Sequence, residues 1–589
     1  MVAFLARSAG RPGEGFNVPG LLGAFGTSAL AATISACLVG LLGVPLAYLL
    51  AHERGPWAAA VNVVVQLPLA LPPLMSGVVL LYVFGPYTWL GRLSGGQFTE
   101  SLAGIVIAQS FVASPFLVVA ARSAFRALDP NLLEVAATAG LGPLGRFGRV
   151  ALPLAAGGIR AGLLLTWLRA FGEYGATVML SYHPYSLPVF TYVQFSAIGL
   201  PATQAPALLA LGLAAGVVAL SRLPVPRRAG RFRRPVGGER TGSASLAAHD
   251  RSPEPVWVGF ELSIRAGGFW LQLRHQASSH RLAILGPSGA GKSLTMHALA
   301  GLAPGRVSFA GRPVGHLPPE RRRVGYVPQG AGLMPHLDAW SNATFGPRAD
   351  PRAAEYWLAA LGISDLAGRL PAQMSGGQRQ RVNLARAFSC HADVVLLDEP
   401  FTGLDAPARA ELLRQLRSLQ REAGLSSVLV THDFSEAALL ADEVVVVSGG
   451  RALQAGALPE VFRRPASPEV ARILGLANVF SGIAASPTSV ATGPLVVTTT
   501  RHGVPPGGPL SWCVRPEHIS LEAAESGTSH PARVLDVVEV GARALATLVF
   551  AGGKTLQAEL DGPRWPLPGS TCWARIPADQ VLVWPAGAP

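Results

Sequence analysis

The chain has 589 residues, of which 50% are hydrophobic, and a formal net charge of +13. Four long runs contain no Asp, Glu, Lys or Arg, at 20–51, 57–91, 101–121 and 174–221. A bilayer core of about 30 Å needs about 20 apolar residues per helix, so these runs exclude an entirely water-soluble chain. They predict an all-α polytopic membrane domain over 20–222, preceded by an N-terminal segment at 1–19.

Five membrane-spanning helices are expected, at 20–51, 57–85, 101–122, 157–181 and 203–222. A sixth helix stays open, because the prolines of "LPLALPPL" at 68 to 73 can break the second span. The loop between the third and fourth spans is rich in Arg, whereas 182–202 contains no Lys or Arg. The positive-inside rule therefore places the 123–156 loop and the C-terminus in the cytoplasm, and the N-terminus outside.

The fourth predicted span carries two charges. Its segment "LLLTWLRAFGEYGATVML" contains Arg169 and Glu173, whose i, i+4 spacing places them on one helix face, where they can pair. Each charge at mid-bilayer costs about 2.5 to 3.5 kcal/mol on insertion scales, so this face is not expected to meet lipid. Two roles stay open for the pair: fixing helix packing, or lining a gate or anion path.

A flexible linker is predicted at 223–254, which is rich in Arg, Pro, Gly and Ser. Six arginines crowd around its start: Arg222, Arg227, Arg228, Arg231, Arg233 and Arg234. Their position after the last apolar run favours anionic lipid headgroups over nucleic acid as the partner. An α/β domain is expected over 255–477, and a small all-β domain, OB-like or a sandwich, over 478–589.

A phosphate-binding loop is predicted at "GPSGAGKS", between a short apolar strand and a helix. Its backbone N–H groups would surround phosphates, Lys292 would reach the β and γ phosphates, and the Ser293 hydroxyl would bind Mg²⁺. Only two of the 48 basic residues are lysines, and one of them stands at this position. The predicted ATP-contacting residues of the loop are Gly286, Pro287, Ser288, Gly289, Ala290, Gly291, Lys292, Ser293 and Leu294.

A pair of carboxylates follows a second apolar strand in "VVLLDEP". Asp398, at the strand end, is expected to hold Mg²⁺, mostly through water. Glu399 beside it is the candidate base that polarises the attacking water.

The segment "MSGGQRQRVNLARAF", 374–388, resembles the signature of ATP-binding cassette (ABC) proteins, with Met374 where Leu is usual. Around it and in the family's order, "YVPQ" resembles the Q-loop, "LDEP" the Walker B end, "GLD" the D-loop and "VTHD" the switch-histidine segment. The resemblance implies a catalytic site shared by two cassettes that face head to tail. One chain carries one cassette, so a homodimer is expected.

The same resemblance implies roles for further residues. Ser375, Gly376 and Gly377, followed by Gln378, would cap the γ-phosphate held by the opposite chain, and Asp405 would belong to the D-loop. Gln329 would sense Mg²⁺ and the membrane domain, and His432 would hold the γ-phosphate and the attacking water. Phe269 is the candidate for stacking on adenine, with Trp270 as the alternative.

The segment "LDPNLLEVAATAGLGPLGRFGRVALPLAAGGI" resembles the cytoplasmic coupling loop of ABC importer permeases, with Glu134, Ala136, Ala137 and Gly140 at the matching positions. A short helix of this kind can sit in a groove of the cassette and transmit its closure. The membrane domain precedes the cassette, as is common in exporters, but exporters have much longer cytoplasmic helices. "ANVFSG" and "WCVRPEHISL" resemble the accessory β-domain of importers.

The segment "RAFGEYGATVML" resembles the molybdate, tungstate and sulfate permeases, whereas the following "SYHPYSLPVFTYVQF" departs from their pattern. These resemblances imply a fused permease and ATPase that imports an oxyanion across the cytoplasmic membrane, with molybdate as the first candidate. A separate extracytoplasmic solute-binding protein is the expected partner, and nucleic acid is not. The alternatives are import of sulfate, tungstate, thiamine, ferric iron or phosphonate, a half-size exporter, and a membrane-tethered cassette regulator.

Overall fold

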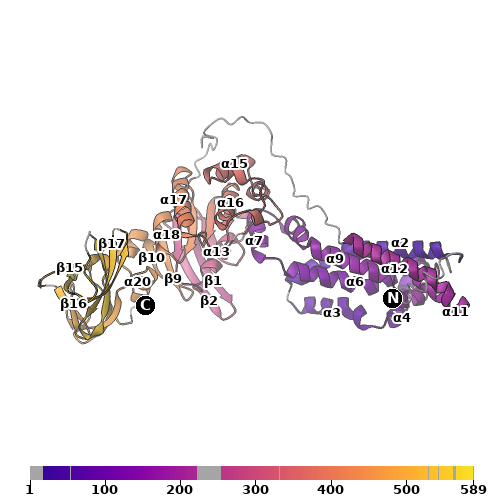
Figure 1. The fold of residues 1–589 in the computed structure, drawn as a ribbon, viewed down its shortest axis with the longest axis horizontal. Coiled ribbons are helices and arrows are strands. Elements are labelled where there is room, and N and C mark those ends of the chain that lie inside the picture. Colours follow the sequence, from indigo (N-terminus) through magenta and orange to yellow (C-terminus); the bar gives the residue numbers. More distant parts are fainter. Residues whose placement is uncertain are drawn as a thin grey trace. The chain divides into compact units, whose positions relative to one another are not determined.

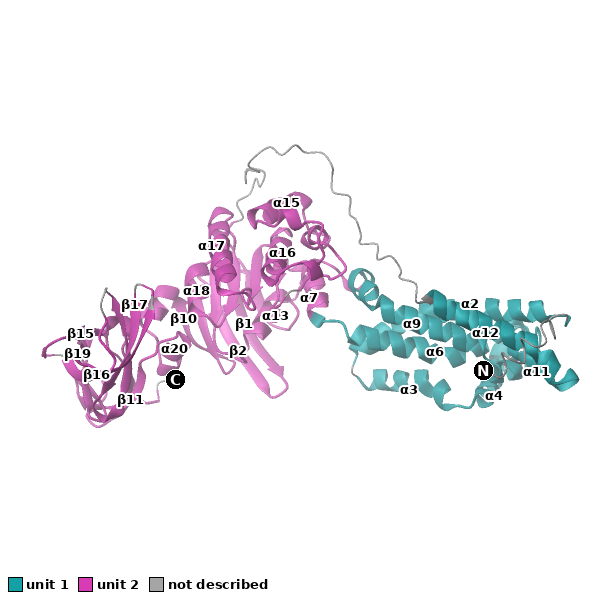
Figure 2. Ribbon diagram, in the orientation of Figure 1, with its two compact units in different colours: residues 1–130, 144–229 teal, residues 131–143, 230–589 magenta. Residues whose placement is uncertain are grey.

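The computed structural model describes residues 18–53, 55–221, 254–330, 332–527, 529–541, 543–561 and 565–587. The chain divides into two compact units, 1–130 with 144–229, and 131–143 with 230–589 (Figure 2). The predicted N-terminal segment up to residue 17 lies outside the described residues. So do the predicted linker, apart from Glu254, and the arginines at its start.

In the described residues, the regular secondary structure of the first unit consists of helices (Figure 1). Its elements are α2 (Leu21–His52), α3 (Pro56–Ala70), α4 (Pro73–Phe84), α5 (Trp89–Leu93), α6 (Leu102–Arg126), α8 (Pro143–Arg146), η1 (Phe147–Ala151), α9 (Leu152–Phe171), α10 (Gly175–Leu180), α11 (Leu187–Ile198), η2 (Leu200–Thr203) and α12 (Gln204–Ser221). Within the described residues, four helical stretches are long and apolar enough to cross a membrane: Leu21–His52, Leu102–Arg126, Pro143–Phe171 and Leu200–Leu220.

Small residues bring the long helices of this unit together. Gly158 and Gly162 of α9 face α6, where an added Cβ would lie 2.6 Å from Ala124 Cβ and 3.0 Å from Ala120 Cβ, respectively. Small residues at a helix interface let the two backbones approach closely, which is how helices pack in lipid. The tight core formed by α2, α6 and α9 follows from this composition.

Two predicted spans are interrupted in the structure. The second breaks at Leu71 and Pro72, as its prolines allow. The fourth, expected as one helix over 157–181, ends at Phe171 and resumes as α10 at Gly175. Glu173 therefore lies in the break rather than on a continuous helix face, and its Oε1 accepts a hydrogen bond from the Ala176 N–H at 2.9 Å.

The predicted external loop also differs, because α11 occupies most of it. The segment 182–202 lacks charges and contains a run of apolar residues from Leu187 onward. Pro188 at the first turn suits a helix start.

The second unit contains a ten-stranded sheet in the order β5-β4-β1-β2-β10-β9-β3-β8-β7-β6. Its strands are β1 (Val258–Ala266), β2 (Phe269–Gln276), β3 (Arg281–Leu285), β4 (Arg306–Phe309), β5 (Arg312–Pro313), β6 (Val324–Val327), β7 (Val394–Asp398), β8 (Ser427–Thr431), β9 (Glu443–Ser448) and β10 (Arg451–Ala457). Strands β3, β8, β7 and β6 pair in parallel and are almost wholly buried, as their β-branched composition favours.

Nine α-helices of this unit lie between or beside its strands in the described residues. They are α7 (Pro130–Thr138), α13 (Lys292–Ala300), α14 (Ala339–Ala343), α15 (Pro351–Ala360), α16 (Gly376–Phe388), α17 (Ala406–Glu422), α18 (Phe434–Leu440), α19 (Leu458–Arg463) and α20 (Pro468–Ile473). Parallel strands feed into helices at their carboxyl ends, where ligands bind in α/β folds.

The C-terminal part forms two five-stranded antiparallel sheets, ordered β13-β12-β11-β14-β20 and β15-β19-β16-β17-β18. The strands are β11 (Val479–Ser486), β12 (Ser489–Thr492), β13 (Leu495–Thr498), β14 (Pro509–Cys513), β15 (Ser520–Glu522), β16 (Ser529–Val540), β17 (Arg543–Phe550), β18 (Thr555–Asp561), β19 (Thr571–Arg575) and β20 (Leu582–Pro585). The expected fold class, an all-α part, an α/β part and a small all-β part, is confirmed.

Replacing Trp512 with Ala is expected to destabilise this β-domain by about 3 to 5 kcal/mol. Trp512 is 1% exposed, lies against Phe480 and donates from its indole N–H to Thr492 Oγ1 at 2.7 Å. Urea titration of the full chain, followed by hydrogen exchange of the β-domain, measures the change. Trp512→Phe keeps most of the apolar volume, so it should lower the free energy of unfolding clearly less than Trp512→Ala. Equal decreases in the two variants would contradict a packing role.

Candidate nucleotide-binding and hydrolysis site

The phosphate loop connects β3 to α13. Gly289 and Gly291 adopt left-handed φ values of 78° and 97°, which side chains disfavour. The Lys292 ammonium, only 4% exposed, donates to the carbonyl oxygens of Gly286 and Pro287, each at 2.9 Å. Burial lowers the pKa of Lys292, and the nearby carboxylates of Glu399 and Asp398 act in the opposite direction. The loop thus holds a cation in place at the N-terminus of a helix, which suits phosphate.

Asp398 and Ser293 lie together beside this loop. The Ser293 hydroxyl donates to Asp398 Oδ1 at 3.4 Å, and Asp398 is 2% exposed. Burial is the main cause that raises the pKa of Asp398 to about 6. Hydroxyl and carboxylate oxygens are ligands that Mg²⁺ prefers, so the two side chains fit this ion.

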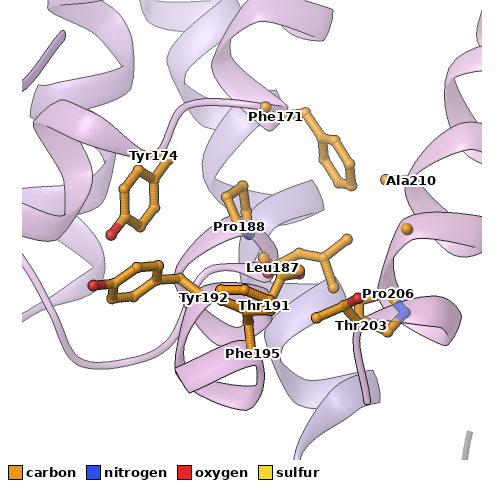
Figure 3. Close-up of a pocket in the computed structure, with 12 residues that line it drawn as sticks. Phe171, Tyr174, Leu187, Pro188, Thr191, Tyr192, Phe195, Thr203, Pro206 and Ala210 are labelled. Carbon is orange, nitrogen blue, oxygen red and sulfur yellow. Dashed lines mark hydrogen bonds between the residues drawn. The ribbon is translucent and has the colours of Figure 1, made fainter. Parts of the chain in front are cut away.

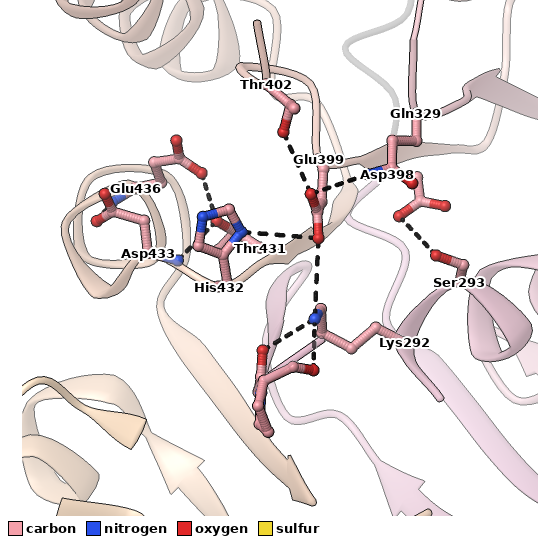
Figure 4. Close-up of polar contacts among 12 residues, drawn as sticks. Lys292, Ser293, Gln329, Asp398, Glu399, Thr402, Thr431, His432, Asp433 and Glu436 are labelled. Atoms are coloured by element: carbon pink, nitrogen blue, oxygen red, sulfur yellow. Dashed lines mark hydrogen bonds and ion pairs between the residues drawn. The ribbon is translucent and has the colours of Figure 1, made fainter. Parts of the chain in front are cut away.

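Glu399 stands at the centre of a polar cluster (Figure 4). Its Oε2 accepts hydrogen bonds from Gln329 Nε2 at 3.1 Å and from Thr402 Oγ1 at 3.2 Å. Its Oε1 lies 3.8 Å from Lys292 Nζ and 3.7 Å from His432 Nδ1. Glu399 has a φ of 44°, a conformation that costs energy for a non-glycine residue and is frequent at functional sites.

Strand topology explains why these side chains meet. Gln329 follows β6, Glu399 follows β7 and His432 follows β8, and these three strands are neighbours in the parallel part of the sheet. The carboxyl ends of parallel strands lie at one edge of the sheet. The structure therefore brings Gln329, Asp398, Glu399 and His432 to the phosphate loop. Thr402 was not foreseen, although its place three residues after Glu399 in the same loop was a signal.

A second network holds the segment that carries His432. Arg409 of α17 pairs with Asp433 at 2.5 Å and with Glu436, whose Oε1 lies 2.9 Å from Arg409 Nε. Asp433 also caps α18 through the Ser435 N–H at 2.7 Å. Sequence reasoning missed this network, because Arg409 is one of many arginines and nothing in the sequence indicates its partners. It ties α17, which follows Asp405, to α18, which follows His432.

The signature residues lie at the N-terminus of α16. Ser375 Oγ accepts from the Gln378 N–H at 3.2 Å, and Gln378 Oε1 accepts from the Ser375 N–H at 2.9 Å, which forms a capping box. Ser375 and Gly376 are exposed. Asp405 caps α17 through the Ala408 N–H at 2.9 Å. In this single chain, the polar contacts described for Ser375 and Asp405 thus stabilise helix starts.

Phe269 lies beside the phosphate loop. A Cβ added to Gly291 would come within 3.2 Å of its ring. Trp270 is 44% exposed and its ring lies 5.0 Å from the Arg265 guanidinium carbon. Of the two candidate aromatics, Phe269 therefore has the direct contact with the loop.

The segment 131–143 belongs to the same compact unit as the cassette. Glu134 Oε2 lies 3.3 Å from His297 Nε2 on α13, and the hydrogen bond with Glu134 is the main cause that raises the pKa of His297. The Arg348 guanidinium donates to the Thr138 carbonyl. A Cβ added to Gly346 would lie 2.5 Å from the Ala139 carbonyl oxygen. The helix α7 thus contacts the helix that begins at the phosphate loop.

The fold and this site define a P-loop ATPase of the cassette type with a helical membrane unit. Three known protein families match successive parts of the chain. The family described as "Binding-protein-dependent transport system inner membrane component" matches residues 43–227, the family "ABC transporter" matches 275–402, and "TOBE domain" matches 512–584.

Curated relatives match about 40 to 50% of this chain. The molybdate/tungstate import ATP-binding protein of Thermococcus kodakarensis is 39% identical over 248 residues, which cover 40% of this chain and 74% of that protein. A sulfate/thiosulfate import ATP-binding protein of Chromobacterium violaceum is 38% identical over 316 residues, 51% of this chain and 84% of that protein. The Fe(3+) ions import ATP-binding protein of Agrobacterium fabrum is 39% identical over 273 residues, which cover 44% of this chain and 76% of that protein.

The chain belongs to the ABC importer family, with permease, ATP-binding cassette and TOBE domain in one polypeptide. It is a membrane protein that binds ATP and couples its hydrolysis to transport.

Proposed function

We propose that the chain imports an oxyanion across the cytoplasmic membrane and that molybdate is this oxyanion. Two of the relatives described above are named for molybdate/tungstate and sulfate/thiosulfate import, which supports this substrate class, whereas the relative named for Fe(3+) ions keeps iron as the alternative. The match of residues 43–227 to the family "Binding-protein-dependent transport system inner membrane component" carries the import direction, and the contact of Glu134 on α7 with His297 supports coupling of α7 to the cassette.

We infer that two copies of the chain form the transporter and receive substrate from a separate solute-binding protein outside the membrane. Ser375, Gly376 and Gly377 of one copy would then face the phosphate loop of the other, and the exposure of Ser375 and Gly376 at a helix N-terminus suits a γ-phosphate. The cassettes and β-domains would lie in the cytoplasm, and no nucleic acid takes part.

In this mechanism Lys292 binds the β and γ phosphates, and Gln329 and His432 orient the reacting groups around Glu399. Glu399 takes the proton of the attacking water. Ser293 and Asp398, with Gln329 nearby, would hold Mg²⁺, which neutralises phosphate charge when bound. Closure of the two cassettes moves α7, which transmits the change to the membrane helices.

Binding of Mg²⁺-ATP is expected to weaken as the pH falls below the Asp398 pKa of about 6. A proton on the carboxylate competes with the metal, and only the ionised form binds it well. A titration of Mg²⁺ affinity at fixed ATP between pH 5 and pH 8 measures the effect. Asp398→Asn should bind Mg²⁺ weakly at every pH; a wild-type affinity that does not change with pH would contradict the assignment.

The substrate is tested in cells that lack their own molybdate and sulfate importers. Expression of the chain with its solute-binding protein should restore uptake of radiolabelled molybdate, and excess unlabelled tungstate should compete. Uptake of iron but of no oxyanion would overturn the proposal in favour of the alternative. ATPase activity stimulated by lipids or drugs without a binding protein would instead indicate an exporter.

A further inference from the structure

The breaks in two helices of the membrane unit lie against each other. Leu71 and Pro72 separate α3 from α4, and residues 172–174 separate α9 from α10. The contact is close, because a Cβ added to Gly175 would lie 2.6 Å from Pro73 Cβ, and one added to Gly77 would lie 2.6 Å from Met179 Cβ. Non-helical backbone at membrane depth occurs where it is buried in protein or lines a cavity.

A cavity of about 370 Å³ opens at these breaks. Pro72, Pro73, Arg169 and the segment 172–175 contribute to its walls. A second cavity of about 520 Å³ shares Gly172 and Tyr174 with the first and is mainly apolar. The rings of Tyr174 and Tyr192 lie together at one edge of this larger cavity (Figure 3). The break between α9 and α10 therefore borders two adjoining spaces in the membrane unit.

The two charges at the smaller cavity differ in their surroundings. The Glu173 side chain is 1% exposed, and its two oxygens are used by the Ala176 N–H and by Arg169. The Arg169 side chain is 30% exposed and lines the cavity. Glu173 is thus held by both the start of α10 and Arg169, whereas the Arg169 guanidinium keeps an exposed part at the cavity. A guanidinium has five N–H donors, and the pair with Glu173 engages Nη1.

We propose that this cavity binds a tetrahedral oxyanion during its passage through the membrane, with Arg169 as the charged contact and Glu173 as the residue that positions Arg169. The planar guanidinium can donate two parallel hydrogen bonds to two oxygens of such an anion. Discontinuous helices are places where transporters bind substrates near the middle of the membrane. The inference rests on the proposed function, and it assigns the two roles separately: Glu173 fixes the break, and Arg169 meets the substrate.

The test uses the full chain in proteoliposomes, with its solute-binding protein outside and ATP in the lumen. Uptake of radiolabelled molybdate and sulfate is compared for the wild type, Arg169→Lys, Arg169→Gln and the exchanged pair Arg169→Glu with Glu173→Arg. Arg169→Gln should lower the maximal uptake about tenfold or more, because a charge-assisted hydrogen bond to the anion is lost. Arg169→Lys should retain part of the wild-type uptake. The exposed Arg92 provides a matched control, and Arg92→Gln should transport normally.

The exchanged pair separates substrate contact from helix packing. It restores an ion pair, so we expect a dimer of normal mass but uptake as low as in Arg169→Gln. Normal uptake by Arg169→Gln would overturn the inference. The inference would also be overturned if uptake were proportional to the amount of dimer in every variant and the exchanged pair transported like the wild type. If the wild type imports neither anion, the proposed function itself is contradicted.

Discussion

The Glu399→Gln chain is expected to bind ATP as tightly as the wild type and to hydrolyse it at least about 100 times more slowly. The amide keeps the size of the side chain and its place beside Gln329, Thr402 and His432, but it cannot accept a proton from water. Steady-state phosphate release and binding of a fluorescent ATP analogue measure the two quantities.

Glu411→Gln is the matched control, because Glu411 is a carboxylate of the same unit that pairs with Arg414 and lies outside the phosphate-loop cluster. It should hydrolyse ATP at the wild-type rate. Because hydrolysis is blocked while ATP stays bound, the two cassettes of the Glu399→Gln dimer should also stay closed on each other in ATP, measurable by cross-linking between the cassettes of the two copies. Normal hydrolysis by Glu399→Gln would contradict the role of Glu399, and full activity of a monomer would contradict the shared site.

The Gly346→Ala chain is expected to lose at least about tenfold in substrate uptake per ATP hydrolysed. Gly346 has a φ of 107°, and an added Cβ would lie 2.5 Å from the Ala139 carbonyl oxygen. A non-glycine residue in the left-handed region costs about 1 to 2 kcal/mol, and the close contact adds to this cost. We expect the strain to be relieved by a shift of the segment that contains α7 away from the cassette. This shift would uncouple ATP hydrolysis from transport.

Uptake and ATP hydrolysis measured in the same proteoliposomes give the required ratio. Gly368→Ala is the control, because a Cβ there would meet nothing within 4 Å, and its ratio should match the wild type. A normal ratio for Gly346→Ala would show that close docking at Ala139 is not needed for coupling. Loss of hydrolysis and uptake in equal proportion would indicate damage to the cassette instead.

The meeting of Gln329, Asp398, Glu399 and His432 was largely predictable from the sequence, because each lies at or just after a strand end and parallel strands collect their ends at one edge. Arg409 and Thr402 were not, since their roles depend on which side chains the fold places beside them. In the membrane unit, apolar length predicted where helices run but not where α9 ends. That end depends on Gly172 and on the capping bond of Glu173, which are local features that hydropathy does not register.

The same distinction applies to the charged pair. The spacing of Arg169 and Glu173 predicted that they would pair, and they do. It could not predict that the Glu173 side chain would be almost wholly buried at the cavity wall while Arg169 stays partly exposed, because this difference arises from the break in the helix.

The most direct test of the account is ATP-driven uptake by proteoliposomes that contain this chain as their sole membrane protein. With ATP in the lumen and the solute-binding protein and labelled molybdate outside, molybdate should accumulate inside at a rate that depends on ATP. The rate should fall to background in Glu399→Gln. Steady ATP hydrolysis without accumulation of molybdate, sulfate or tungstate, or net movement of solute out of the lumen, would contradict it.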